Sequence, residues 1–288
     1  MKKNLNIETF IACDKEYSAA DTVIFGAPFD GTTSYRPGTR FGGKYIRAES
    51  YGIETYSPYQ DKDLEDICVY DGGELEFPFG NTEKVLQMIE NYTDEVLKDG
   101  KTPLMIGGEH LVTLGAVRAA VKKYPNLNIV HFDAHADLRD EYLGEKLSHA
   151  CVLRRCHELV GDGKIYQFGI RSGEKSEFQF AAAHTYMRKF DLKGLDEIYN
   201  KIKDEPVYFT IDLDVLDSSV FPGTGTPEAG GISFNELVEG IITVGGRLNV
   251  VAADINELSP PYDQSGISTA AACKTLRELL LSIHKEKM

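Results

Sequence analysis

The sequence is poor in the residues that mark several classes of protein. It has no tryptophan and only five cysteines, and no apolar run approaches the roughly 18 residues that span a bilayer. The cysteines are odd in number and have no CxxC spacing, which excludes a disulfide framework and a zinc knuckle. We therefore expect no membrane partner and reduced, buried thiols at Cys13, Cys68, Cys151, Cys156 and Cys273.

Basic residues are scarce relative to acidic ones. The 288 residues include 31 Lys and Arg against 45 Asp and Glu, a formal net charge of −14 at pH 7. This balance argues against nucleic acid as a partner, because phosphate binding requires basic patches. The 42% hydrophobic and 26% charged fractions are typical of a folded chain. No linker or repeat interrupts the sequence, so we expect a single domain over residues 1–288.

The first residues do not resemble a signal peptide. Glu8, Asp14 and Glu16 interrupt the apolar residues that follow Lys2 and Lys3. We expect a cytoplasmic protein.

Short apolar runs alternate with stretches of helical period, which predicts an α/β fold with a mainly parallel sheet flanked by helices. The expected strands are 22–25, 67–70, 103–106, 128–132, 165–168, 207–211 and 249–253. The expected helices are 82–98, 111–124, 151–159, 234–244 and 269–284. Two long loops, 26–43 and 218–231, are rich in Gly, Pro and Thr, and loops of this length are more often functional than idle. The segment 223–231 lacks the ending of a phosphate-binding loop, so we expect it to form the wall of a pocket.

Acidic and imidazole side chains follow three of the expected strands. His110 follows the strand 103–106; Asp133, His135 and Asp137 follow 128–132; and Asp212 and Asp214 follow 207–211. The i, i+2 spacing places such side chains on one side of an extended backbone, and the carboxyl ends of parallel strands are where open α/β sheets form their sites. A single Asp-x-Asp is usually a turn or cap. The joint occurrence of these residues favours a site.

Four carboxylates that converge require cations to balance them. At about 4 Å and an effective dielectric constant near 20, each pair repels by about 4 kcal/mol. Imidazole and carboxylate ligands without thiolates suit Mn²⁺, Co²⁺, Fe²⁺ or Zn²⁺. Two such ions with a bridging hydroxide would leave the site slightly negative, which favours a cationic substrate. His131 lies deeper in its strand, and we expect it to support the ligands or pack in the core.

Several ordered motifs resemble the ureohydrolase family, which includes arginases and agmatinases, and they are most similar to those of bacterial agmatinases. The motifs are Gly26-Ala-Pro-Phe-Asp30, Ser34 to Gly42 with Ile46-Arg47, Gly107-Gly-Glu-His110, Phe132-Asp-Ala-His-Ala-Asp137, Ser148-His149, Phe168-Gly-Ile-Arg171, Thr210 to Asp217, Pro222 to Thr226 and Asp254-Ile-Asn-Glu257. The resemblance covers nearly the whole chain. It implies a three-layer α/β/α domain around a mostly parallel sheet, and a homo-oligomer that is commonly trimeric or hexameric.

The same resemblance implies two Mn²⁺ ions and the residues that bind them. His110, Asp133, Asp137 and Asp212 would bind one ion, and Asp133, His135, Asp212 and Asp214 the other. In the family, a hydroxide held between the ions attacks the guanidinium carbon and releases urea and a primary amine. Asp137 would also orient that hydroxide.

Two further residues match the family's substrate machinery. Glu257 matches the glutamate that grips the guanidinium, and His149 matches the loop histidine that transfers protons to the departing amine. Ala150 and Cys151 replace a glycine-containing sequence of some relatives, and Glu74 stands where relatives tend to have Asp. Cys151 could make the site sensitive to oxidation.

The loop 138–145 bears on the substrate. Arginases hold the amino-acid end of arginine with small polar residues in this loop, whereas this chain has Asp140, Glu141 and Glu145. These acids favour a cationic guanidine compound, agmatine, which would yield putrescine and urea. Arg139 argues the other way, since it could receive the carboxylate of guanidinobutyrate, arginine or formiminoglutamate. Two other functions stay open: a metal-dependent amide hydrolase or deacetylase with one catalytic ion, and a non-enzymatic metal-binding protein.

Overall fold

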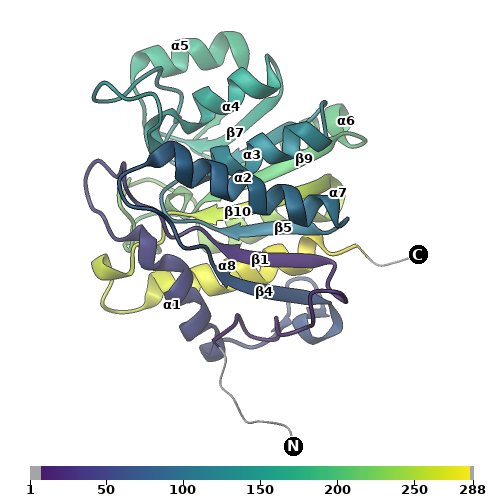
Figure 1. The fold of residues 1–288 in the computed structure, drawn as a ribbon. Helices are drawn as coiled ribbons and strands as arrows, with labels where there is room; N and C mark the ends of the chain where they lie inside the picture. The colour runs from purple at the N-terminus through teal and green to yellow at the C-terminus, as the bar shows by residue number, and fades with distance from the viewer. Residues whose placement is uncertain (1–7, 286–288) are drawn as a thin grey trace, which may run out of the picture.

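Eight strands form the central sheet of the computed structural model, which describes residues 8–285 (Figure 1). Lys2 and Lys3, the basic residues near the start of the sequence, lie outside this range. Every pairing of neighbouring strands in this sheet is parallel. In spatial order the strands are β4 (Val69–Glu74), β1 (Thr22–Gly26), β5 (Thr102–Ile106), β10 (Asn249–Asn256), β9 (Pro206–Asp212), β6 (Asn128–Phe132), β7 (Ile165–Ile170) and β8 (Tyr186–Lys189).

Helices cover both faces of the sheet, and each face has its own apolar core. One core joins the sheet to α2 (Thr82–Lys98), α3 (Val112–Lys123), α4 (Val152–Val160) and α5 (Lys175–His184). The other joins it to α1 (Gly42–Glu49), α6 (Leu195–Ile202), α7 (Phe234–Arg247) and α8 (Ile267–Ile283). In Figure 1, α2 and α3 lie in front of the sheet and α8 behind it. The predicted three-layer α/β/α fold is confirmed.

Strand residues alternate between the two cores, as the pleat requires. Ile24 packs in the core that contains α8, whereas its neighbour Phe25 packs in the core that contains α2. Phe209 and Tyr208 divide between the cores in the same way. Both faces are therefore apolar, which explains why the strands are continuous apolar runs.

The seven predicted strands and five predicted helices are all present, with ends that shift by up to four residues. The structure also contains elements that were not predicted: helices α1, α5 and α6, strand β8 and a small antiparallel hairpin, β2 (Tyr56–Ser57) with β3 (Lys62–Asp63). Helix α5 buries only Glu177 and Ala181, so no apolar stripe marks it. The other missed elements are eight residues or shorter.

The register of the central strands brings their carboxyl ends to one level. Phe132 of β6 pairs with Ile211 of β9, and Ile255 of β10 pairs with both Ile211 and Ile106 of β5. The residues that follow these positions therefore leave the sheet side by side. This edge of the sheet is where the predicted site residues lie.

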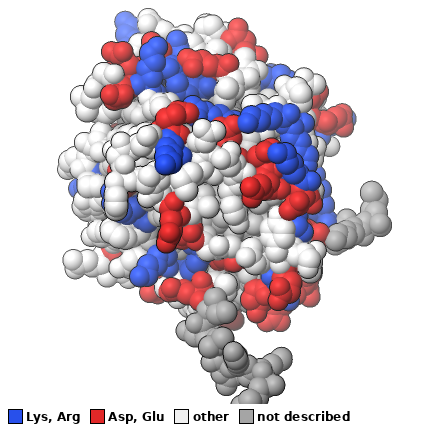
Figure 2. All heavy atoms as spheres, viewed as in Figure 1, with Lys and Arg blue, Asp and Glu red and all other residues white. Residues whose placement is uncertain are grey.

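Within residues 8–285, no helix is long and apolar enough to cross a membrane. On the face shown in Figure 2, acidic and basic side chains are interspersed rather than gathered into one basic patch. Free thiols occur at all five cysteines, but Cys68 is only partly buried, which corrects the expectation that all five are buried. It follows β3 in a turn that leads to the edge strand β4, where fewer neighbours cover it.

A buried ion pair fastens α1 to the edge strand β4. Arg47 donates two hydrogen bonds to the carboxylate of Asp71, and both residues are less than a tenth exposed. We expect Arg47→Ala to lower the free energy of unfolding by about 3–5 kcal/mol, because it leaves a buried carboxylate without its partner. Urea denaturation measures the change. Arg118→Ala, which breaks the exposed pair with Glu83, is the control and should cost at most about 1 kcal/mol. A similar small loss for Arg47→Ala would contradict the prediction.

Candidate metal centre and substrate cavity

Four neighbouring strands of the sheet, β5, β10, β9 and β6, deliver the predicted site residues. His110 follows β5, Asp133, His135 and Asp137 follow β6, Asp212 ends β9 and begins the turn that holds Asp214, and Glu257 follows β10. The glycines before His110 allow this crowding, since a Cβ on Gly108 would lie only 2.0 Å from the carbonyl oxygen of Phe29.

The imidazole of His110 faces three of the predicted carboxylates. Its Nδ1 atom lies 3.1 Å from Asp133, 3.3 Å from Asp137 and 3.5 Å from Asp212. Its other nitrogen, Nε2, lies 2.8 Å from the hydroxyl oxygen of Thr210. If Nε2 carries the proton and donates it to Thr210, Nδ1 presents a lone pair to the carboxylates, as a metal ligand must. This group contains the four residues expected at one metal ion.

A second imidazole faces the remaining carboxylate. Nδ1 of His135 lies 2.9 Å from Asp214 and 3.5 Å from Oδ1 of Asp133. Asp133 therefore contacts both imidazoles, with Oδ2 toward His110 and Oδ1 toward His135. Asp212 contacts the second group through Oδ1, which accepts the backbone N–H of Asp214. A carboxylate shared in this way suits a ligand that bridges two ions.

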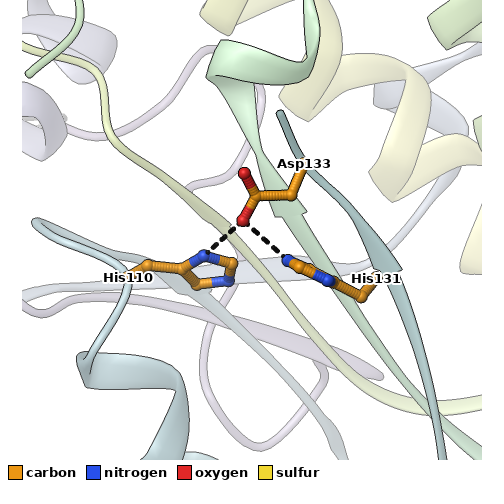
Figure 3. A group of neighbouring side chains, drawn as sticks. All are labelled: His110, His131 and Asp133. Carbon is orange, nitrogen blue, oxygen red and sulfur yellow. Dashed lines mark hydrogen bonds and ion pairs between the residues drawn. The ribbon is translucent and has the colours of Figure 1, made fainter. Parts of the chain in front are cut away.

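A third imidazole, that of His131, also contacts Asp133, as Figure 3 shows. Its Nε2 lies 2.7 Å from Asp133 Oδ2, and its Nδ1 lies 3.2 Å from the side-chain nitrogen of Gln167. That amide also donates to the carbonyl of Ala136, which fixes its orientation. His131 Nδ1 thus accepts and Nε2 donates, so neither nitrogen has a lone pair free for a metal. His131 therefore holds the carboxylate of Asp133 in place by a hydrogen bond, in agreement with the supporting role expected for it.

Burial makes the charges of this group interdependent. Burial and the charge of Asp133 raise the pKa of Asp137 to about 7, and burial and Asp214 raise the pKa of Asp212 well above its usual value. Burial opposes ionisation of Asp133 as well, but the surrounding imidazoles hold its pKa well below the usual value. Buried acids so close together either bind protons or bind cations. The donor set, four carboxylates and two imidazoles, therefore fits a pair of divalent metal ions.

Two of the site residues have a left-handed backbone, which is uncommon for residues other than glycine. Asp137 has φ 53° and Glu257 has φ 69°. The carbonyl of Asp137 accepts N–H bonds from Leu153 and Arg154 at the start of α4, and the N–H of Glu257 donates to Gly108. Such conformations cost on the order of 1–3 kcal/mol each and persist where the surroundings impose them. Conformations of this kind are common at functional sites, so their position supports a site at this edge.

Glu257 lies directly beside the His110 group. Its Oε1 accepts the backbone N–H of His110 at 2.9 Å. Burial, together with the charges of Glu109 and Asp214, raises the pKa of Glu257 well above its usual value. Because Oε1 is already engaged, Oε2 is the oxygen left for a ligand.

His149 is held by the loop that follows β1. Its Nδ1 lies 2.9 Å from the carbonyl oxygen of Thr32, and its Nε2 lies 3.2 Å from the hydroxyl of Ser34. A carbonyl can only accept, so Nδ1 carries the proton and Nε2 is the free base. Burial lowers the pKa of His149 to about 4, so its imidazole is neutral at pH 7.

Sequence reasoning missed the residue that holds this loop in place. The carboxylate of Glu109 accepts hydrogen bonds from the N–H and hydroxyl of Thr32 and from the hydroxyl of Thr33. Burial raises the pKa of Glu109 to about 7. The sequence signal that could have identified Glu109 was its position before His110 in the Gly107-Gly-Glu-His110 motif.

A cavity of about 410 Å³ opens over His135 and Asp137, two of the predicted metal ligands. His149 and Tyr142 form part of its wall, and Thr226 to Glu228 confirm the expectation that the glycine-rich segment forms a pocket wall. Cys151 is buried, its sulfur lies 3.9 Å from the carbonyl oxygen of Glu145, and burial raises the pKa of its thiol to about 11. A protonated thiol reacts slowly with oxidants, so the expected sensitivity to oxidation is not favoured.

Arg139 lines the cavity but is already paired. Its guanidinium lies 2.9 Å from Glu174 and 3.6 Å from Glu177, and it stacks over the ring of Tyr142. Glu228, a further acid at the cavity, lies 3.9 Å from Nε2 of His135. The acids of this wall therefore outnumber its arginine. None of the three loop acids that we expected to favour a cation lines this cavity: Asp140 pairs with Arg155, and Glu141 and Glu145 are not among the lining residues.

The model of the arginase family matches residues 20–282 of this sequence. The chain belongs to the arginase family. It is 47% identical to an agmatinase of Bacillus subtilis over 96% of this chain and 97% of the relative. It is also 34% identical to a guanidinobutyrase of Pseudomonas aeruginosa over 92% of this chain and 87% of the relative. These arginase-family relatives support a hydrolase that acts on guanidino compounds.

Solved structures of the arginase family agree with this fold. An agmatine ureohydrolase of Thermoplasma volcanium superimposes with a TM-score of 0.88 at 33% identity, over 97% of this chain and 95% of that one. A protein of Clostridium difficile, provisionally described as an agmatinase, gives a TM-score of 0.90 at 51% identity, over 93% of this chain and 98% of that one. The arginase-like fold predicted from the motifs is therefore confirmed.

Proposed function

We propose that this arginase-family protein hydrolyses agmatine to putrescine and urea. The pairing of Arg139 with Glu174 and Glu177 carries the choice of substrate, because it leaves no free guanidinium at the cavity for a substrate carboxylate. Agmatine has a guanidinium at one end and an ammonium at the other. A cavity with an excess of carboxylates favours such a dication over guanidinobutyrate or arginine.

The proposal includes two Mn²⁺ ions as the resident cofactors. His110, Asp133, Asp137 and Asp212 would hold one ion, and Asp133, His135, Asp212 and Asp214 the other. When bound, two divalent cations supply Lewis-acid activation of water near neutral pH. The contacts of Asp133 with both imidazoles support its assignment as a bridging ligand.

The remaining residues bind the substrate and move protons. Glu257 receives the guanidinium through Oε2, and its negative charge favours the planar cation. Asp137 accepts a hydrogen bond from the attacking water and so orients it. Nε2 of His149 accepts a proton and delivers it to the departing amine nitrogen, which leaves as the end of putrescine.

The role of His149 gives a testable result. We expect His149→Ala to lower kcat about 100-fold, because the departing amine loses its proton donor, while both metals are retained. Steady-state kinetics with metal analysis measure the change. Ser34→Ala removes the hydroxyl beside Nε2 but not the imidazole, and it serves as the control with a much smaller loss. An unchanged kcat in His149→Ala would exclude the proton-transfer role.

The substrate assignment is tested by product release from a panel. Agmatine, arginine, guanidinobutyrate and formiminoglutamate are offered to Mn²⁺-loaded protein, and urea, or formamide for the last compound, is measured. We expect preferential turnover of agmatine. Preference for a carboxylate substrate would overturn the assignment but keep the reaction type.

Arg139→Ala tests the reason given for that preference. If Arg139 only neutralises the cavity wall, its removal leaves kcat/KM for guanidinobutyrate little changed, and kcat/KM for agmatine stays the same or rises, since the wall becomes more acidic. Kinetics of both substrates give the two values. A fall in turnover of guanidinobutyrate alone would show instead that Arg139 binds the carboxylate.

Four finer points belong to the same proposal: Mn²⁺ as the physiological ion, a trimer or hexamer, a cytoplasmic location and a single domain over residues 1–288. Metal analysis of protein purified from its source tests the identity of the ion, and light scattering tests the oligomeric state. Cell fractionation tests the location, and a single unfolding transition is expected for a single domain. The acidic net charge and the absence of a long apolar run in the sequence support the location.

A further inference from the structure

A group of side chains outside the cavity brings two imidazoles and a carboxylate together. His157 lies in the last turn of α4, Asp162 in the turn that follows, and His184 at the end of α5. Oδ1 of Asp162 lies 2.8 Å from Nε2 of His157 and 2.7 Å from Nδ1 of His184. The three potential ligand atoms all lie within 4.8 Å of one another.

This group lies at the opposite end of the sheet from the candidate metal centre. Asp162 lies shortly before β7, and His184 is separated from β8 only by Thr185, so both lie at the amino ends of parallel strands. The candidate centre lies beyond the carboxyl ends of the strands. The group is therefore separate from the proposed reaction and independent of the proposed function.

Neighbouring contacts hold the three side chains in place. The ring of Phe180 stacks on His184 with centroids 4.3 Å apart and meets His157 edge-on at 5.0 Å. The N–H of Gly163 donates to the carbonyl of His184, which ties the turn of Asp162 to the end of α5. Side chains that are already ordered lose less entropy when they bind a ligand.

The local charges favour a cation. Both imidazoles lie in the last turn of a helix, where unpaired carbonyl groups carry partial negative charge. Hydrogen bonds from His157 and His184 hold the pKa of Asp162 below its usual value, so its carboxylate is ionised at neutral pH. The guanidinium of Arg154, which lies over Phe180, acts in the opposite direction.

We propose that His157, Asp162 and His184 form an additional metal site for a borderline divalent ion of the Zn²⁺ or Ni²⁺ class. Two imidazoles with one carboxylate are ligands that such ions prefer, whereas Mn²⁺ and Mg²⁺ prefer sites richer in oxygen. The side chain of Asp162 is 69% exposed, so solvent can reach the site and supply the remaining ligand. Before binding, the ring nitrogens that face Asp162 carry the protons; on binding, each imidazole gives that proton to solvent and takes one up on its other nitrogen, so it stays neutral and presents a lone pair to the ion.

An ion at this site would link the end of α4 to the end of α5 at the β7–β8 side of the sheet. The two hydrogen bonds that the histidines donate to Asp162 would then be replaced by bonds from all three side chains to the ion. The distances of 2.7 and 2.8 Å must lengthen by about half an ångström, because ligands about 2.0–2.1 Å from a tetrahedral ion lie farther apart. The exposed turn of Asp162 can make that adjustment.

Zinc binding to the Mn²⁺-loaded protein tests the proposal. The protein is titrated with Zn²⁺ against a chromophoric chelator, desalted, and analysed for both metals. We expect one additional Zn²⁺ per chain with Mn²⁺ retained, and we expect Asp162→Asn and His184→Gln each to weaken that binding by at least about tenfold. Asp204→Asn, which changes an exposed aspartate elsewhere, is the matched control and should bind Zn²⁺ like the original protein.

A second measurement separates this site from the dinuclear centre. Electron paramagnetic resonance of added Cu²⁺ should report two nitrogen ligands in the original protein and one in His184→Gln. Three results would overturn the proposal: Mn²⁺ released in proportion to the Zn²⁺ gained, no additional ion bound, or unchanged Zn²⁺ affinity in both variants. Because urea release is not among these readouts, failure of the proposed function would leave this test unaffected.

Discussion

Asp133→Ala is expected to abolish metal binding and to lower kcat/KM by a factor on the order of 10⁴ or more. Asp133 contacts His110 and His135 at the same time, so its removal takes one anion from each of the two proposed ions. It also leaves the N–H of His131 without its acceptor. We expect Asp212→Ala to behave in the same way, because Asp212 contacts His110 and the turn of Asp214.

Metal content per chain, measured after reloading and desalting, is the primary readout for these variants. Asp217→Ala provides a control in the same Asp-x-Asp-x-x-Asp segment: its carboxylate binds Ser219 and the N–H groups of Gly230 and Gly231, and within residues 8–285 it contacts no imidazole. We expect that variant to keep both ions. Circular dichroism checks that each variant folds. A folded Asp133→Ala protein that retains both ions would contradict the bridging role.

Glu257→Gln is expected to keep both metal ions but to lower kcat/KM by about 30-fold to several thousand-fold, equivalent to about 2–5 kcal/mol. The reason lies in the hydrogen bond between Glu257 Oε1 and the N–H of His110. The amide oxygen of glutamine must stay at that position, so the NH₂ group takes the place of Oε2. A donor would then face the N–H groups of the guanidinium, where an acceptor is required.

Kinetics with agmatine and metal analysis of the same preparation measure this effect. Glu257→Asp is the matched variant, because it keeps the charge but draws the carboxylate back by one methylene group. We expect it to bind substrate better than Glu257→Gln if charge dominates recognition. Loss of metal from Glu257→Gln would show that Glu257 is itself a ligand and would contradict its assigned place.

The sequence predicted the strands and the ends at which the site forms because both depend on local pattern. Apolar runs marked the strands, and parallel strands necessarily bring their carboxyl ends to one edge. The convergence of His110 with Asp133 and Asp212 followed from that rule. Helix α5 was not predicted because it buries few apolar side chains. Its buried Glu177 accepts a hydrogen bond from the N–H of Leu138, in the loop that follows Asp137.

Other features of the site depend on contacts that no local pattern contains. The left-handed backbone of Asp137 is imposed by N–H groups of α4, which follow about fifteen residues later in the chain. The engagement of Arg139 by Glu174 could not be predicted from the sequence, because Glu174 caps a helix that was not predicted. Because Glu174 pairs with Arg139, the guanidinium is not free to receive a substrate carboxylate, as the sequence had suggested. Likewise, Asp140 of the acidic loop pairs with Arg155.

The order of the strands has a consequence for synthesis of the chain. Strands β9 and β10 are made last but lie between β5 and β6, in the middle of the sheet. A nascent chain that ends before Pro206 would hold two separate sets of strands, β4-β1-β5 and β6-β7-β8, each with an unpaired inner edge. Such edges can pair with other chains. The ribosome must therefore release almost the entire chain before the sheet closes, and only then do the acids of β6 and β9 meet His110.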